Sequence, residues 1–418
     1  MAFARAIIIA ATVAGLLRFG LSPASAAAPD VTLAAAGDIA CSPTYTVLAT
    51  RCHEAGTAGL IGRLAPTAVA ALGDTQYDAG ALSDYMASFD PTWGSFKSLI
   101  HPAPGNHEYY TPGAAGYYAY FGVAAGDPRK GYYSYDLGSW HILALNSNCR
   151  VVACGTGSAQ ERWVRADLAA HPRDCTLAYW HHPLFSSQGG ADRMYQIWRT
   201  LSAFKVDIVL SGHKHNYERF AAQDNRGRPD LVHGIREFIV GTGGEDLSTI
   251  RGQAANSEAR DSSSFGVLAL QLKRGAYDWR FYSENTSFTD AASDVCHDKT
   301  PPAIRSLSLQ TRAFHAAPRG GSLSRHAGGA LLRYRLSKPA TVAFSVERAK
   351  SGHRGGQQAV RLPGTFTRPS RSGRNRVRFT GRLRGRRLPP GRYRLVAVAT
   401  DAAQNKSAVA RTRFAIGG

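Results

Sequence analysis

Five short polar clusters, each at or near the end of an apolar run, constrain this chain more than any other feature. They are GDIA (37–40), GDTQY (73–77), GNHE (105–108), WHHP (180–183) and GHKH (212–215). Sites in α/β sheets form in the crevice beyond the carboxyl ends of the strands, so clusters far apart in sequence can converge there. We therefore expect a single site assembled from all five clusters.

The side chains in these clusters suit transition metals. Asp and Asn offer hard oxygen donors and His offers nitrogen, a mixture that favours iron, zinc or manganese over a lone calcium ion. A carboxylate shared by two cations holds them about 3.5–4 Å apart, a geometry suited to phosphoryl transfer to water. Each cluster alone also fits a structural turn or a structural histidine. Their joint occurrence at strand ends favours a two-metal site.

The stretch from about residue 31 to residue 285 alternates apolar, β-branched runs with amphipathic helical runs, which predicts an α/β domain. Predicted strands are Val31–Ala36, Ala68–Leu72, His141–Leu145, Thr176–Trp180, Val206–Leu210 and Arg236–Val240. Predicted helices are Ala159–Ala170 and Asp192–Phe204. Two hairpins are expected, at 132–140 and at 267–282.

The composition changes at DKTPPAI (298–304), a turn-rich segment that predicts a domain boundary. Short alternating runs follow at Val342–Val346, Arg376–Thr380 and Tyr393–Ala399, between clusters of Gly, Pro and Ser. These features predict a small all-β sandwich without helices, and they resemble immunoglobulin-like or fibronectin-type modules. The expected division is a catalytic domain at 29–298 and a basic β-sandwich at 299–418.

The first 28 residues have the pattern of a cleavable export signal. Arg5 precedes the apolar run Ala6–Leu17, and small residues follow at 24–26. The run is too short to span a bilayer, and no later segment looks transmembrane. The expected location is therefore outside the cytoplasm, either secreted or associated with the cell wall.

Six cysteines in an exported protein usually form disulfides. Their order along the chain suggests the pairs Cys41–Cys52, Cys149–Cys154 and Cys175–Cys296, although six cysteines allow 15 connectivities. A cysteine metal site is disfavoured because no CxxC pair is present.

The net charge of +20 is unevenly distributed. Residues 301–418 hold 25 Lys or Arg against two acidic residues, a balance of +23, and the remainder is near −3. The cluster at Arg382, Arg384, Arg386 and Arg387 predicts loose adhesion to polyanions such as wall polymers, lipid head groups or extracellular nucleic acid. Specific nucleic-acid recognition is not expected, because aromatic residues do not interleave the arginines.

The five clusters, with GHKH continuing as GHKHNYER, resemble the ordered motifs of calcineurin-like metallophosphoesterases. A tyrosine three residues after Asp74 narrows the resemblance to purple acid phosphatases. The implied fold is a β-sandwich flanked by helices (αββα). The implied cofactors are two metal ions, Fe(III) with a divalent Fe, Zn or Mn.

The resemblance also implies roles for individual residues. The first ion would be bound by Asp38, Asp74, Tyr77 as tyrosinate and His215. Asp74 would bridge to the second ion, bound by Asn106, His181 and His213, and a hydroxide held between the metals would attack phosphorus. His107 would contact the phosphate or the leaving group, Glu108 would orient His107, and His182 would either donate a proton or point away. Tyr217, Glu218 and Arg219 would support the site.

Two departures from the family pattern bear on the chemistry. The first motif ends in Ala40 instead of the usual glycine, which should only adjust the turn. The segment LFSSQGGADRM (184–194) lacks the histidines that plant relatives use as proton donors, so the leaving-group chemistry is not transferable.

The expected function is hydrolysis of phosphomonoesters by this metal centre. The alternatives are a phosphodiesterase acting on nucleotides or lipid head groups, and a catalytically inactive cell-wall adhesion protein. A serine hydrolase has no support, because no GxSxG motif is present.

Overall fold

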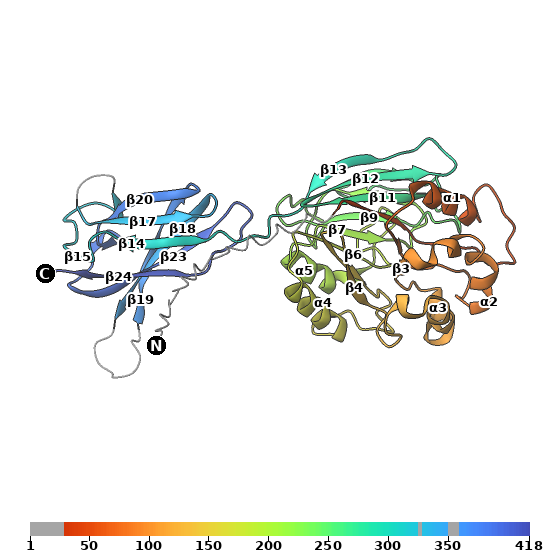
Figure 1. Ribbon diagram of the computed structural model, residues 1–418, viewed down its shortest axis with the longest axis horizontal. Coiled ribbons are helices and arrows are strands. Elements are labelled where there is room, and N and C mark those ends of the chain that lie inside the picture. The colour runs from red at the N-terminus through yellow and green to blue at the C-terminus, as the bar shows by residue number, and fades with distance from the viewer. Residues whose placement is uncertain (1–28, 325–327, 350–358) are drawn as a thin grey trace, which may run out of the picture.

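The computed structural model describes residues 29–324, 328–349 and 359–418, which form two bodies (Figure 1). The predicted export signal, residues 1–28, lies outside the described part. The bodies meet where Lys205 of the first body reaches the second, donating to the Asn405 side-chain oxygen at 2.7 Å. Across the described residues, we find no helix with the length and apolarity required to cross a membrane.

The first body contains two β-sheets. One sheet has the order β13-β12-β11-β1-β2-β3 and the other the order β10-β8-β9-β7-β6-β5-β4. The strands of the six-stranded sheet are β1 (Val31–Ala36), β2 (Ala68–Ala71), β3 (Ile100–Pro102), β11 (Gly266–Lys273), β12 (Ala276–Ser283) and β13 (Ala291–Val295). Those of the seven-stranded sheet are β4 (Tyr133–Leu137), β5 (Trp140–Ala144), β6 (Cys175–Tyr179), β7 (Ile208–Ser211), β8 (Tyr217–Phe220), β9 (Arg236–Val240) and β10 (Ser257–Asp261).

The helices of the first body are short. The α-helices are α1 (Glu54–Leu64), α2 (Leu82–Asp84), α3 (Ala115–Phe121), α4 (Ala159–Ala170) and α5 (Tyr195–Ala203). A π-turn, η1 (Tyr85–Phe89), and five 3-10 turns accompany them: η2 (Trp93–Leu99), η3 (Glu108–Tyr110), η4 (Pro112–Ala114), η5 (Gly122–Ala125) and η6 (Asp192–Met194).

Alternation along the strands of the seven-stranded sheet separates two cores. On β5, Ile142 belongs to the core shared with the six-stranded sheet, whereas Leu143 faces the helices α4 and α5. Helix α4 is capped by Ser158, whose hydroxyl accepts from Glu161 N at 3.1 Å, and it buries Val164. The helices α1 to α3 lie with the six-stranded sheet (Figure 1). The expected helix–sheet–sheet–helix fold is confirmed.

The predicted elements of this body agree closely with the structure. Strands β1 and β9 and helix α4 have the expected bounds, and the other predicted strands differ by one or two residues. Both expected hairpins are present, as the antiparallel pairs β4–β5 and β11–β12.

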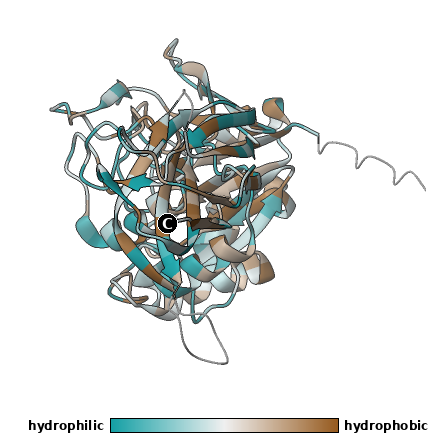
Figure 2. Ribbon diagram, turned by 90° about the vertical axis from the view of Figure 1, so that its left-hand side faces the viewer, coloured by the Kyte–Doolittle hydropathy of each residue, from teal (hydrophilic) through white to brown (hydrophobic). Residues whose placement is uncertain are grey.

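The second body is a β-sandwich, and its described residues contain no helix. Its sheets have the orders β14-β17-β20-β16 and β15-β24-β23-β18-β19, with a two-stranded ribbon β21-β22. The strands are β14 (Ile304–Leu309), β15 (Ala313–Phe314), β16 (Leu323–Ser324), β17 (Ala330–Leu336), β18 (Ala340–Ala349), β19 (Ala359–Ser370), β20 (Gly373–Phe379), β21 (Arg382–Leu383), β22 (Arg386–Arg387), β23 (Gly391–Thr400) and β24 (Ala410–Ile416). Leu332, Phe344, Phe379 and Leu395 lie in its core, and hydrophobic and hydrophilic segments intermingle along its strands (Figure 2).

The three suggested disulfides are present: Cys41–Cys52, Cys149–Cys154 and Cys175–Cys296. The last joins the first residue of β6 to the segment after β13 and thereby links the two sheets of the first body.

Candidate metal centre

Two neighbouring turns place the first carboxylates. Asp38 and Asp74 follow the neighbouring parallel strands β1 and β2. Two backbone hydrogen bonds join the turns, from Asp38 N to Gly73 O at 3.0 Å and from Ile39 N to Asp74 O at 3.0 Å. Both aspartates adopt positive φ, 57° for Asp38 and 46° for Asp74, a conformation that non-glycine residues rarely take and that clusters at functional sites. A side chain at Gly73, itself at φ 84°, would lie 2.8 Å from His181, so the close approach requires glycine.

The Asp74 carboxylate lies at the middle of the centre. Its Oδ2 atom is 2.9 Å from His181 Nε2 on one side and 3.3 Å from the Tyr77 hydroxyl on the other. Its Oδ1 atom accepts from the backbone N–H of His107 at 2.8 Å. One carboxylate thus contacts residues of both predicted ligand sets.

Asp38, Tyr77 and His215 form one side of the centre. The Tyr77 hydroxyl donates to Asp38 Oδ1 at 2.9 Å and is 3.1 Å from His215 Nε2, which in turn is 3.1 Å from Asp38 Oδ1. The other ring nitrogen of His215, Nδ1, is bonded to the Asp246 carboxylate. A carboxylate on Nδ1 fixes the ring so that Nε2 faces the site.

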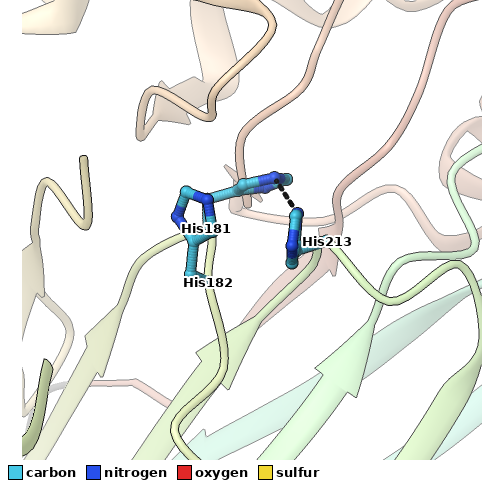
Figure 3. Close-up of side chains that lie close together, drawn as sticks. All are labelled: His181, His182 and His213. Carbon is cyan, nitrogen blue, oxygen red and sulfur yellow. Dashed lines mark hydrogen bonds between the residues drawn. The ribbon is translucent and has the colours of Figure 1, made fainter. Parts of the chain in front are cut away.

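His181 and His213 form the other side (Figure 3). His181 Nδ1 donates to Leu72 O at 2.9 Å, which leaves Nε2 directed at His213 Nδ1, 3.2 Å away. Asn106 lies in the turn after β3, and its Oδ1 atom is buried without a hydrogen-bond partner among the described residues. A buried polar atom without a partner is costly and calls for a ligand.

The two histidines predicted to act on substrate also lie here. The ring of His107 packs at a tilt of 42° against that of Tyr77, with ring centroids 4.1 Å apart, and its Nε2 atom is 3.9 Å from Asp74 Oδ2. The ring of His182 lies 4.4 Å from that of His213, and its Nδ1 is 2.9 Å from the Ser147 hydroxyl. His182 therefore lies against the cluster and does not point away from it.

Glu108 does not orient His107, contrary to the expectation. Its buried carboxylate accepts from the backbone N–H of Gly105 at 2.6 Å, Asp74 at 3.0 Å and Thr75 at 2.7 Å. The Thr75 and Tyr85 hydroxyls complete its contacts. Because a carboxylate can accept several bonds while these N–H groups have no other partner nearby, Glu108 ties together the second and third polar turns.

Burial and neighbouring charges shift the pKa values of these side chains. Burial raises the pKa of Asp38, but the adjacent His215 and other imidazoles outweigh it and hold the pKa at about 2. Burial lowers the pKa of His181, and Asp74 outweighs it to give about 9. Burial and the carboxylates of Asp38 and Asp74 raise the pKa of Tyr77 well above its usual value. The centre therefore attracts positive charge.

Further residues hold the predicted metal ligands in place, and the sequence predicted only some of them. Glu218, predicted to buttress the site, accepts from Ser187 N at 2.9 Å and thereby holds the loop that follows His181. Buried Glu237 accepts from Leu184 N at 3.2 Å in the same loop. Asp246 and Ser147 were not predicted, and no sequence signal marks them.

Residues 32–217 match the calcineurin-like phosphoesterase family. The chain is 26% identical over 279 residues to purple acid phosphatase 22 of Arabidopsis thaliana, covering 54% of this chain and 62% of the relative. An uncharacterised protein of Mycobacterium tuberculosis is 32% identical over 188 residues, covering 35% of this chain and 36% of that protein. The chain thus spans less than two thirds of the length of these relatives.

Among solved structures, a purple acid phosphatase from yellow lupin seeds superposes with a TM-score of 0.51 at 19% identity, covering 65% of this chain and 55% of that one. This likeness concerns the fold. The matched family and the converging clusters define the first body as a calcineurin-like metallophosphoesterase domain. Within that class, the chain is similar to purple acid phosphatases.

Proposed function

We propose that this protein is an exported phosphatase that hydrolyses phosphomonoesters at a two-metal centre. The observation that carries the proposal is the position of Asp74, whose Oδ2 atom contacts His181 on one side and Tyr77 on the other. A carboxylate between two donor sets is the arrangement that a pair of cations requires.

The first ion would be held by Asp38, Asp74, Tyr77 and His215. The donor set fits Fe(III), because burial beside two carboxylates raises the pKa of Tyr77 and only a strongly acidic cation would ionise it at neutral pH. The hydrogen bond between His215 Nδ1 and the Asp246 carboxylate leaves Nε2 as the nitrogen that faces Asp38 and Tyr77 and would bind such an ion.

The second ion, a divalent Fe, Zn or Mn, would be held by Asp74, Asn106, His181 and His213. The unpartnered Oδ1 atom of Asn106 supports this assignment, as does the hydrogen bond from His181 Nδ1 to Leu72 O, which leaves Nε2 free. When bound, two such ions supply Lewis-acid polarisation of the phosphoryl oxygens and a nucleophile derived from water.

His107 and His182 would act on the substrate. The Nδ1 atom of His107 is held at 2.5 Å by Asp78 O, so Nε2 is the atom available to a phosphate oxygen. The contact between His182 Nδ1 and Ser147 leaves His182 Nε2 to carry a proton toward a departing alkoxide.

Hydrolysis of paired chromogenic phosphate monoesters and diesters tests the proposal. The full chain should hydrolyse the monoester faster, and elemental analysis should find two metal ions per chain, including iron. Asp74→Asn should abolish turnover and lower the metal content. The same change at Asp224, which forms a surface ion pair with Arg228 at 2.6 Å, should alter neither.

Faster diester turnover would replace the substrate assignment. No turnover after metal reconstitution would refute the enzymatic function and favour the adhesion protein.

Export is supported by the three disulfides, because such bonds persist in oxidising compartments. Location of the protein in the cell-free medium or the wall fraction tests it, and retention in the cytoplasm with reduced cysteines would refute it.

A further inference from the structure

The four-stranded sheet of the second body has an arginine-rich outer face. Along β17 the side chains alternate, so that Leu332 and Tyr334 are buried in the sandwich while Arg333 and Arg335 are exposed. Strand β20 repeats the pattern. The exposed arginines of the two strands are Arg333, Arg335, Arg374 and Arg376.

These arginines lie directly opposite one another across the strands. Arg335 pairs in register with Arg374 on one side and with Arg305 of β14 on the other, and Arg333 pairs with Arg376. Neighbouring strands are about 4.8 Å apart and same-face residues about 6.6 Å apart along a strand, so the guanidinium groups form a compact grid. Like charges directly opposite one another destabilise a sheet. The fold alone gives no reason for this arrangement.

A hollow of about 1050 Å³ runs over this face. Its lining includes the four exposed arginines together with Arg368 of β19 and Arg371 of the turn that follows β19, and it contains no carboxylate. Ser306 and Ser308 of β14 add hydroxyl groups. All charged groups that line the hollow are therefore positive and are hydrogen-bond donors.

The domain holds no internal counterion for this face. Its only acidic residues are Glu347 and Asp401. Asp401 is paired with Lys338 at 2.9 Å, and Glu347 belongs to β18 of the other sheet, opposite Arg361. No carboxylate lines the hollow, so neutralisation of the grid has to come from outside this domain.

One arginine of the cluster singled out in the sequence, Arg382, is less available, whereas Arg384, Arg386 and Arg387 are exposed. The Arg382 guanidinium donates to the backbone carbonyls of Ala317, Pro318 and Gly320 at 2.8–3.0 Å, so it fastens a loop of the domain. Arg382 thus has a structural role, whereas the cross-strand grid places several exposed arginines along one hollow.

We propose that this hollow binds a linear polymer that carries a phosphate group in each repeat. Six lining arginines exceed what a single small anion can contact, which points to an extended chain. Each phosphate of such a polymer carries two terminal oxygens, so successive phosphates can accept from guanidinium groups on neighbouring strands, as at Arg335 and Arg374.

The described part of this face has no exposed aromatic ring on which a nucleic-acid base could stack. The one aromatic side chain in the lining, Tyr334, is buried, and its hydroxyl is 2.6 Å from the Ser370 hydroxyl. Without an exposed ring on which a base can stack, the groove has donors for the backbone alone.

Binding of the full chain to long-chain inorganic polyphosphate tests the proposal. Affinity should fall steeply with salt, and Arg335→Gln with Arg374→Gln should lower the slope of log affinity against log salt by about 1.4, at roughly 0.7 for each lost phosphate contact. The matched control is Arg411→Gln with Arg413→Gln, which removes the same charge from exposed positions of β24 in the other sheet. The control should keep at least most of the wild-type slope.

Three results would overturn the proposal. Equal losses in the two double variants would show that only net charge matters. Tighter binding of polyuridylate would assign the face to nucleic acid, and tighter binding of anionic phospholipid vesicles would assign it to a membrane. Misfolding is checked by thermal unfolding: because the change relieves a like-charge pair, Arg335→Gln with Arg374→Gln should not lower the melting temperature.

Discussion

Replacement of Glu108 measures how firmly the metal-binding turns are held. The carboxylate accepts from three buried backbone N–H groups, those of Asp74, Thr75 and Gly105. In Glu108→Gln the amide nitrogen is best placed at the Oε1 position, because the hydroxyls of Thr75 and Tyr85 that donate to Oε1 can rotate and accept instead. Only the backbone N–H of Thr75, which also donates to Oε1, then loses its acceptor. One unsatisfied buried group costs about 1–3 kcal/mol. Glu108→Ala leaves all three without a partner, and we expect a loss of about 4 kcal/mol.

Thermal unfolding of the full chain is the assay. For a domain of this size each kcal/mol shifts the melting temperature by about 2–4 °C, which gives a drop of about 2–12 °C for Gln and about 8–16 °C for Ala. Glu284→Gln is the control, because Glu284 bonds His53 at 3.0 Å in a partly exposed pair and its loss should cost about 1 kcal/mol or less. A Glu108→Gln variant as stable as Glu284→Gln would refute the reasoning.

Two further predictions concern stability. Burial lowers the pKa of His141, but its hydrogen bonds to Asp167, at 2.7 Å, and to Asp136 outweigh burial and raise the pKa. The stabilisation from these bonds is therefore complete below about pH 6.5 and is lost as the pH rises through the folded-state pKa. In denaturant titrations, His141→Gln should lower the free energy of unfolding by about 1–3 kcal/mol at pH near 5.5 and by less at pH near 9. Removal of the Cys175–Cys296 disulfide, which closes a span of 121 residues, should lower the free energy of unfolding by about 3 kcal/mol more than removal of Cys149–Cys154, which closes a span of 5. The reason is that a longer closed span restricts the unfolded chain more, and equal losses in unfolding experiments would contradict it.

The features predictable from the sequence are those encoded locally. Strand β1 is a continuous apolar run that ends at Gly37 and Asp38, and helix α4 carries both its cap at Ser158 and its apolar face within 13 residues of sequence. The polar residues after β1, β2, β6 and β7 follow from the same logic, since parallel strands of one sheet end at one edge.

The roles that were missed depend on contacts between distant segments. Glu108 lies beside His107 in sequence, but its bonds reach Asp74 and Thr75, more than 30 residues away. Likewise Asp246 reaches His215 across 31 residues. No local spacing reveals such bonds. The arginine grid was missed for a related reason: alternation within β17 is readable, but the register that sets Arg335 against Arg374 is not.

The predicted metal ligands come from two sheets, so the packing of the core between the sheets sets the distances between these ligands. Asp38 and Asp74 follow strands of the six-stranded sheet, whereas His181 and His213 follow strands of the seven-stranded sheet. A sliding of one sheet over the other would change the 2.9 Å separation of Asp74 Oδ2 and His181 Nε2 directly. Packed interiors resist such sliding because a displacement of a fraction of an ångström already forfeits dispersion energy. The hydrophobic core between the sheets therefore sets the spacing of the donors as much as the turns that carry them.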